Sequence, residues 1–312
     1  MLGHLSILQA LSACERVSKD GRYTIPIKGF LTPSFIVTIS AYIQKHQLSD
    51  DTFIFPNNDH FVYLSYINFF SLWNKNPTVN RVNNGKNYSL LTLLENEEVT
   101  NQANSQIVSC IKHLADNANS DGIDLLQEVI GELHDNVWSH GISTGFSMAQ
   151  KNKDVLEFAL ADYGLGFLRE LQRVGISDID THQGAIEWCI QKGNSSKKIS
   201  VEKEDDWLQA LPPDCIGNPM GASAKYKKAN NHAGLGLAKL IDLVKKYDGE
   251  LQIVSGNSML ELKNDDISFK DIPYYWQGVI IRCKFNISKL KSIISNDNQA
   301  ELDSILNALT GL

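Results

Sequence analysis

GIDLLQEVIGELHDNVWSH, residues 122–140, is the stretch that decides the fold, because two sets of side chains recur along it at helical spacing. The apolar set has the spacing of a helix that packs one face on a core, and consists of Leu126, Val129, Ile130, Leu133 and Val137. The polar set lies on another face and consists of Glu128, Glu132, Asn136 and His140. An Asn oxygen can ligate Mg²⁺, and a carboxylate one turn away can orient or deprotonate a water. The helix alone predicts either a solvated polar face or a site for a hard cation and a water.

A second motif follows an apolar strand. Residues 155–166 read VLEFALADYGLG, so the strand ends at Asp162 and the chain then turns at Gly164 and Gly166. Glycine allows a tight backbone turn, and a carboxylate at the end of the strand can accept a hydrogen bond from an exocyclic amino group. The motif predicts either recognition of such a group or an ordinary Asp/Gly turn.

A third motif opens a helix with two glycines. Residues 233–240 read AGLGLAKL, with Gly234 and Gly236 ahead of an apolar helical pattern. Free backbone N–H groups and the helix dipole favour an anion at such a helix start. No Gly-Lys-Ser/Thr follows, so the segment is not a Walker A loop. We therefore predict that phosphate binds at this helix start.

The order of the three motifs resembles the signature of the gyrase, heat-shock chaperone, histidine kinase and mismatch-repair (GHKL) superfamily of ATPases. The resemblance covers roughly residues 105–290 and extends to the strand-like residues 249–256. It implies an α/β fold, with a C-terminal two-layer α/β sandwich of helices on a mixed sheet, known as the Bergerat fold. It also implies ATP and Mg²⁺ as cofactors.

The resemblance further implies roles for single residues. By position, Asn136 resembles the Mg²⁺ ligand of the family, and Glu132 resembles the catalytic base of its hydrolysing members. Asp162 resembles the residue that accepts a hydrogen bond from the adenine amino group, and Gly164 and Gly166 would let the backbone pass the base. The residues that would present the phosphate-binding turn are Gly234, Leu235, Gly236 and Leu237.

Within the superfamily, residues 136–141 (NVWSHG) are most similar to the bacterial anti-sigma-factor serine kinases. Two departures from the family pattern stand out. The last strand of the family often starts with Gly-Thr, whose hydroxyl helps to hold adenine, whereas Gly278 is followed here by Val279. The expected ATP lid, residues 197–231, carries an insertion at 201–220. The lysines of the lid would either meet the γ-phosphate or form a solvated basic run, and they are Lys225, Lys227 and Lys228.

The N-terminal residues predict a separate small α/β unit. Strands are expected at 22–28 and 52–56, and helices at 33–46 and 60–73. The aromatic side chains of the last helix predict a core or a domain interface, with a ligand groove as the alternative. The unit resembles STAS-like domains in outline. Phosphorylated STAS antagonists carry a Ser in the loop after a central strand, but the loop 56–60 here holds no Ser, so the resemblance implies a unit that binds a partner without accepting phosphate.

The predicted domains are therefore 1–100, a regulatory or partner-binding unit; 101–290, the ATP-binding domain; and 291–312, a helical tail. The 312-residue chain has a net charge of -7, which argues against nucleic acid as its main partner. Its five cysteines are scattered, as expected for reduced thiols. No apolar run approaches the roughly 20 residues of a membrane span, and the start lacks a signal peptide pattern. These features predict a cytoplasmic protein that does not span a membrane.

Three functions are consistent with these motifs. The leading expectation is a Mg-dependent ATPase that acts as a nucleotide-gated switch on an unidentified partner protein, either alone or as a homodimer. The second is a protein serine/threonine kinase of the anti-sigma-factor type, in which Glu132 would activate a hydroxyl group of the partner. The third is a module that binds ATP or ADP without turnover.

Overall fold

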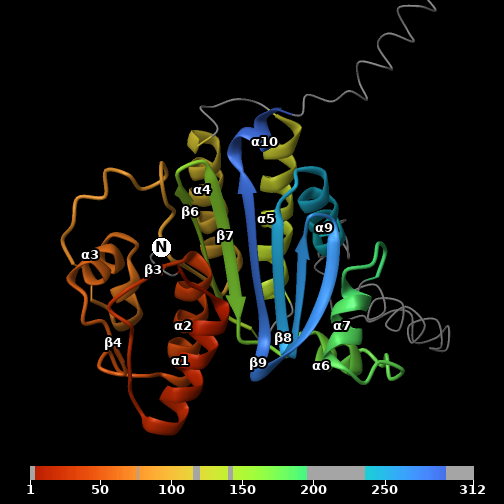
Figure 1. The fold of residues 1–312 in the computed structure, drawn as a ribbon, viewed down its shortest axis with the longest axis horizontal. Coiled ribbons are helices and arrows are strands. Elements are labelled where there is room, and N and C mark those ends of the chain that lie inside the picture. Colours follow the sequence, from red (N-terminus) through yellow and green to blue (C-terminus); the bar gives the residue numbers. More distant parts are fainter. Residues whose placement is uncertain (1–3, 76, 115–119, 140–142, 195–235, 293–312) are drawn as a thin grey trace, which may run out of the picture.

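The computed structural model describes residues 4–75, 77–114, 120–139, 143–194 and 236–292, which form a mixed α/β structure (Figure 1). This confirms the predicted α/β class. None of the helices in these ranges is long and apolar enough to cross a membrane. The predicted lid with its insertion and lysines, Gly234 and Leu235, and the His-Gly pair of residues 140–141 all lie outside the described residues, as do residues 293–312 of the predicted tail.

A five-stranded antiparallel sheet forms the centre of the fold, in the order β5-β6-β7-β9-β8. The strands are β5 (Thr92–Leu94), β6 (Gly145–Asn152), β7 (Val155–Asp162), β8 (Glu250–Lys263) and β9 (Asp266–Asn286). The hairpin between β8 and β9 turns at Asn264 and Asp265, both with positive φ. Two positive φ values suit the twist of a two-residue hairpin loop. In the middle of the sheet, β7 pairs with the C-terminal end of β9.

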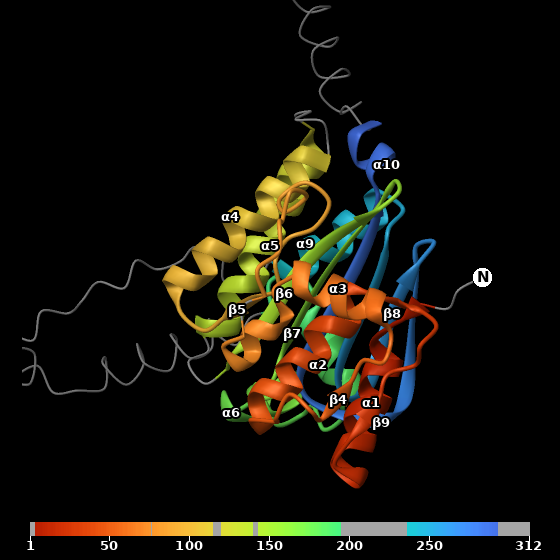
Figure 2. The same ribbon diagram turned by 90° about the vertical axis from the view of Figure 1, so that its left-hand side faces the viewer.

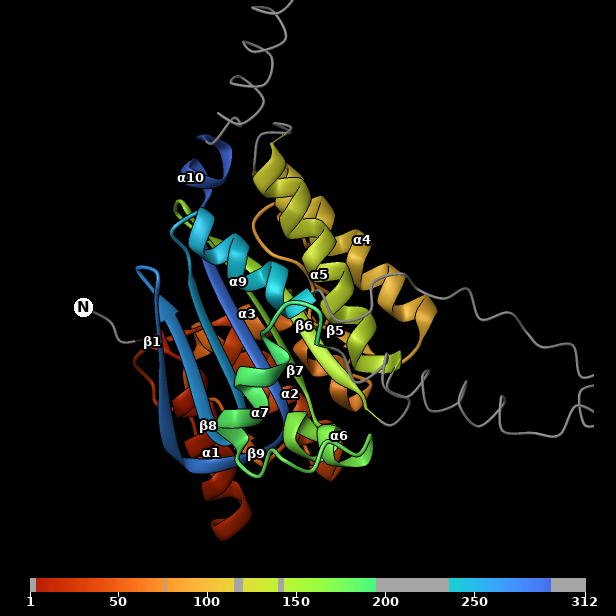
Figure 3. The ribbon, with the colours of Figure 1, turned by 90° about the vertical axis from the view of Figure 1, so that its right-hand side faces the viewer.

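Helices cover one face of this sheet and share a single hydrophobic core with it (Figures 1 and 3). They are α4 (Glu97–Leu114), α5 (Asp121–Ser139), α6 (Gly166–Arg173), α7 (His182–Cys189), α9 (Gly236–Lys246) and the short α10 (Ile287–Ser292). The apolar stripe predicted for residues 122–140 is buried in this core. His134 ties α5 to α4, because its Nδ1 lies 2.6 Å from Asn104 Oδ1. Burial lowers the pKa of His134 to about 3, so the ring is neutral.

The N-terminal residues cover the opposite face of the sheet (Figure 2). They form α1 (Ile7–Asp20), α2 (Pro33–His46), α3 (Asn58–Tyr66), the 3₁₀ helix η1 (Phe69–Trp73) and two parallel pairs of short strands. These strands are β1 (His4–Leu5), β2 (Tyr23–Thr24), β3 (Phe30–Leu31) and β4 (Phe53–Ile54). Ala159 and Ala161 of β7 belong to the core on this side, and their small side chains allow α2 to pack close to the strand. The sheet is therefore buried between two layers of helices.

A buried carboxylate fixes α2 to the sheet. Glu157 of β7 accepts hydrogen bonds from the Ser34 backbone N–H at 3.3 Å and the Ser34 hydroxyl at 3.1 Å, in the first turn of α2. Arg282 Nε and Lys284 Nζ of β9 each lie 3.3 Å from a Glu157 oxygen. The N-terminus of a helix favours negative charge, and a buried carboxylate needs such partners. Glu157 therefore connects the two halves of the chain through one strand.

The predicted helices were confirmed where the periodicity of apolar residues was strong. The helix expected at 33–46 is α2, and it begins at Pro33 with Thr32 as its N-cap. Three expectations were wrong in detail. The strands expected at 22–28 and 52–56 are only two residues long each, as β2 and β4, and the helix expected at 60–73 divides into α3 and η1 because Asn68 between them adopts a positive φ. Of its aromatic side chains, Phe69 is buried in the core whereas Phe61 is 50% exposed.

Removing the buried carboxylate tests this connection. We expect Glu157→Ala to lower the free energy of unfolding by about 3 kcal/mol, because Arg282 and Lys284 would lose their common partner. The control is Glu15→Ala, which removes the exposed Glu15–Lys19 pair of α1 and should cost less than about 1 kcal/mol. Urea unfolding of both variants provides the measurement. Equal losses would contradict a special role for Glu157.

Candidate functional site

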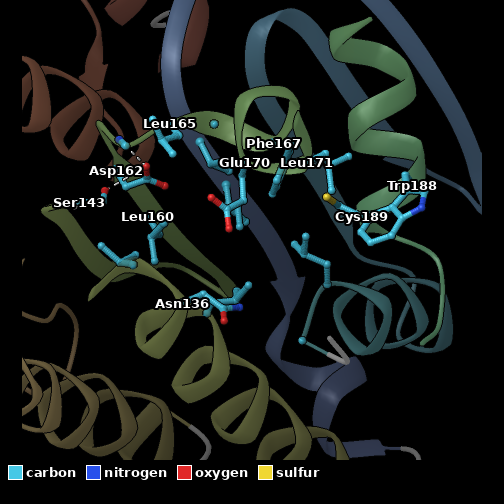
Figure 4. A pocket seen from close by; sticks show the side chains of 18 of the residues that line it. Asn136, Ser143, Leu160, Asp162, Leu165, Phe167, Glu170, Leu171, Trp188 and Cys189 are labelled. Atoms are coloured by element: carbon cyan, nitrogen blue, oxygen red, sulfur yellow. Dashed lines mark hydrogen bonds between the residues drawn. The ribbon is translucent and has the colours of Figure 1, made fainter. Parts of the chain in front are cut away.

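A cavity lies between the sheet and the helices α5, α6, α7 and α9 (Figure 4). It is partly open to solvent, and the empty space in it, open solvent included, is about 1100 Å³. Asp162 and Ser143 lie at one end, Trp188 and Cys189 at the other, and Asn136 and Glu170 between them. Apolar side chains form much of the wall, and they are Leu133, Val137, Leu160, Leu165, Phe167, Leu171, Leu237, Val279 and Ile281.

The Asp162 carboxylate is held by the turn that follows it. Its Oδ1 accepts hydrogen bonds from the Gly164 backbone N–H at 2.8 Å and from the Ser143 hydroxyl at 3.3 Å. A Cβ added at Gly164 would come within 2.8 Å of Ser143 Oγ and 3.0 Å of Asp162 Oδ1. A residue with a Cβ at position 164 would therefore crowd the Ser143 and Asp162 side chains. The Gly164 N–H and the Ser143 hydroxyl hold the Asp162 carboxylate in a defined direction at the end of the cavity.

Two further glycines let the turn lie against β9. Gly166 has a φ of 74°, and a Cβ there would come within 2.4 Å of the Gln277 carbonyl oxygen. A Cβ on Gly278 would come within 2.2 Å of the Asp162 carbonyl oxygen. The Ser255 hydroxyl completes the contact, since it accepts from the Phe167 N–H at 3.2 Å and donates to the Gly278 carbonyl at 3.1 Å. The turn after β7 is thus packed backbone to backbone on β9.

The helix residues of the predicted site meet this turn across the cavity. Asn136 of α5 is exposed and lines the cavity, as do Gly236 and Leu237 at the start of α9. A Cβ at Gly236 would lie 3.9 Å from Asn136 Nδ2, so the two helices are close at this point. Glu132 does not line the cavity. It is buried one turn behind Asn136, where its Oε1 accepts a hydrogen bond from Lys239 at 2.6 Å.

The structure therefore brings together six of the predicted residues around one cavity: Asn136, Asp162, Gly164, Gly166, Gly236 and Leu237. Glu132 lies directly behind them, while Gly234 and Leu235 lie outside the described residues. Comparison with family models, curated proteins and solved structures finds no match to this chain.

Sequence reasoning did not single out Ser143, Glu170, Trp188, Cys189 and Asn194, which also line the cavity. Ser143 places a hydroxyl beside Asp162, whereas Val279 presents only an apolar side chain to the cavity. Glu170 forms two hydrogen bonds with Arg173, at 2.9 and 2.8 Å. Burial raises the pKa of the Cys189 thiol to about 12, so it stays protonated and is a poor nucleophile.

The Asp162 turn also contacts the N-terminal layer. Trp276 of β9 donates its indole N–H to the Asp162 carbonyl oxygen at 2.9 Å, and its ring meets the Tyr163 ring edge-on with 4.8 Å between the centroids. The Tyr163 hydroxyl lies 3.3 Å from Nε2 of His46, the last residue of α2. The cavity is therefore connected to α2 through a chain of three aromatic rings.

Substituting Gly166 tests whether the turn depends on its approach to β9. We expect Gly166→Ala to lower the free energy of unfolding by about 2–4 kcal/mol, because a left-handed φ and a backbone clash would add. The matched control is Gly21→Ala, at a φ of 77° with no atom within 4 Å of the added Cβ. It should cost only about 1 kcal/mol. Urea unfolding of both variants gives the comparison, and equal losses would show that the clash is relieved.

Proposed function

We propose that this protein binds Mg·ATP in the cavity and hydrolyses it, as a nucleotide-gated switch that acts on a partner protein. One observation supports this most strongly: three motifs far apart in the sequence, at Asn136, Asp162 and Gly236, line a single cavity. Each motif alone is common. Their convergence on one cavity favours a ligand that needs all three, with a polar base, an anionic chain and a metal ion.

The order of elements supports a GHKL-type fold for residues 92–292. The helix with Glu132 and Asn136 precedes the β6–β7 hairpin, the Asp162 turn follows, and α9 leads into the β8–β9 hairpin. In this arrangement the helices α4, α5 and α9 and the sheet form the two layers of the proposed sandwich. The N-terminal layer of α1 and α2 is an addition on the other face.

The residues present fit the chemistry of Mg·ATP. At one end, the Asp162 carboxylate would accept a hydrogen bond from the adenine amino group, with the Ser143 hydroxyl beside it. The apolar wall, which includes Leu160 and Val279, suits the faces of a base. At the start of α9, Gly236 has no side chain to block a phosphate, and the helix dipole favours its charge. Asn136 would supply one oxygen to Mg²⁺, which neutralises phosphate charge and otherwise prefers phosphate and water ligands.

Glu132 would act as the general base for hydrolysis. It lies one helical turn from Asn136 and faces the first residue of α9, since a Cβ on Gly236 would come within 3.1 Å of Glu132 Oε2. A carboxylate in this place would accept a proton from an attacking water held near the phosphates. If a hydroxyl group of a partner protein took the place of the water, the same residue would support phosphotransfer.

The contact between Tyr163 and α2 supports a switch. The turn that would hold adenine is packed against Trp276 and His46, so a change in the turn on ligand binding would alter contacts of the N-terminal layer. That layer would then present a different surface to a partner. Such a relay requires two arrangements of the turn with different ligand affinity.

Calorimetry with variants of the two cavity ends tests the binding mode. We expect Asn136→Ala to remove the Mg²⁺ dependence of ATP binding, because it loses the proposed metal ligand. We expect Asp162→Ala to weaken ATP about 10- to 100-fold, the effect of losing a charged hydrogen bond, and to reduce the preference for ATP over GTP. The control is Asp178→Ala, at an exposed position away from the cavity. Parental binding by both cavity variants would reject the site.

Glu132→Ala tests hydrolysis separately from binding. The variant should bind Mg·ATP as the parent does but release phosphate roughly 10²–10⁴-fold more slowly, the usual effect of losing a general base. Phosphate release and calorimetry on the same protein provide the two measurements. Parental turnover by the variant would exclude Glu132 as the base. If the parent itself binds ATP without releasing phosphate, a passive nucleotide-binding module or a kinase awaiting its substrate becomes the better interpretation, and labelled phosphate transfer to a co-purified protein separates them.

A further inference from the structure

Lys239 of α9 bridges two carboxylates of α5. Its Nζ lies 2.6 Å from Glu128 Oε1 and 2.6 Å from Glu132 Oε1. The side chain of Glu132 is only 5% exposed, whereas those of Lys239 and Glu128 are 27% and 49% exposed. The bridge therefore starts at the protein surface and ends on a buried carboxylate directly behind the cavity.

The close approach of α9 to α5 makes this bridge possible. Gly236, the first residue of α9, is packed against Glu132, because an added Cβ would come within 3.2 Å of Glu132 Cβ and 3.1 Å of Oε2. Lys239 follows three residues later, on the same face of the helix. Its ammonium group donates a hydrogen bond to Oε1 of Glu132, while Oε2 faces Gly236 at the start of α9. The bridge thus sets which oxygen of the carboxylate faces the proposed phosphate site.

Electrostatics explains why a cation is needed here. Two carboxylates four residues apart on a helix repel each other, and a buried carboxylate without a partner is strongly unfavourable. Hydrogen bonds to Glu128 and Glu132 raise the pKa of Lys239 above its usual value, so the ammonium group stays charged. One lysine therefore donates to both carboxylates and joins α5 to α9, two of the helices that border the cavity.

We infer that Lys239 is a positioning residue, which holds the Glu132 carboxylate in the orientation that serves the proposed hydrolysis. The inference rests on the proposed function, and it adds a residue that makes no contact with the cavity. A lysine that only clamps α5 to α9 would affect stability and nothing else. A positioning lysine instead affects turnover, and does so only while Glu132 is present.

The test compares Lys239→Met with Lys239→Arg and with a control, Lys245→Met, at an exposed lysine of the same helix. We expect Lys239→Met to lower kcat for Mg·ATP hydrolysis about 10- to 100-fold, the usual effect of a misplaced catalytic group, with little change in KM. Lys239→Arg should recover most of the activity, because Arg can also reach both carboxylates. Lys245→Met should hydrolyse ATP as the parent does.

A double variant separates positioning from clamping. Lys239→Met should cause no further loss of kcat in a Glu132→Ala background, since the two residues would act as one unit. An equal loss in both backgrounds, or parental kcat for Lys239→Met, overturns the inference while leaving the proposed ATPase intact. If the parent releases no phosphate from Mg·ATP, the proposed hydrolysis fails, and with it the role of Lys239.

Thermal melting shows whether Lys239→Met is folded. If it is not, Glu128→Gln replaces it, because this variant removes the outer anchor of Lys239 at a half-exposed position and leaves α9 unchanged. Its kcat should fall about two- to fivefold, in line with the small contribution of an exposed ion pair. Parental kcat for Glu128→Gln would then overturn the inference.

Discussion

The burial of β7 on both faces is the constraint on which the rest of the structure depends. Side chains of a strand alternate between its two faces, and on β7 both faces meet a core. Leu156, Phe158 and Leu160 pack against the layer of α5, whereas Ala159 and Ala161 pack against the layer of α2. A shift of one residue would exchange the two sets and is therefore strongly disfavoured. The same alternation turns Asp162, the last residue of the strand, toward the cavity side.

Close approaches at glycine residues position the walls of the cavity around the end of β7. The backbone after Asp162 lies against β9 at Gly166 and Gly278, and α9 lies against α5 at Gly236. At each place a larger residue would move one wall of the cavity relative to another. The turn after β7 thus touches β9 through the backbone, whereas α9 packs at Gly236 against the Glu132 side chain of α5.

Local sequence patterns could predict the parts of the fold that depend on neighbouring residues. The helices α2 and α5 followed from periodicity, and Asn136, Asp162 and Gly236 followed from motifs with known spacing. The packing of the N-terminal layer on the sheet could not be predicted this way, since it depends on partners far apart in the chain. Glu157 illustrates the difficulty, because in an apolar strand its carboxylate has no local partner, and Ser34 lies 123 positions away.

The missed residues of the site share one property: they act through contacts between elements. Ser143 meets Asp162 across the β6–β7 pair, and Lys239 meets Glu132 between two helices. In the sequence, a lysine in the first turns of a helix resembles any solvated charge. Only the approach of α9 at Gly236 gives it a buried partner. Motifs of this kind therefore identify groups that would touch a ligand, whereas the groups that orient them emerge from tertiary packing.

β7 also joins the two layers of helices. Glu157 holds the first turn of α2 on one face of the strand, and Asp162 lies at its end on the other face. Tyr163, the next residue, meets the C-terminal end of α2 through His46. Helix α2 is therefore attached at both ends to the strand that carries the candidate adenine-binding residue. A displacement of the turn would have to move α2 or break one of these attachments, because both faces of the strand are close-packed. This double attachment gives the N-terminal layer a direct mechanical connection to the cavity, without any contact to a ligand.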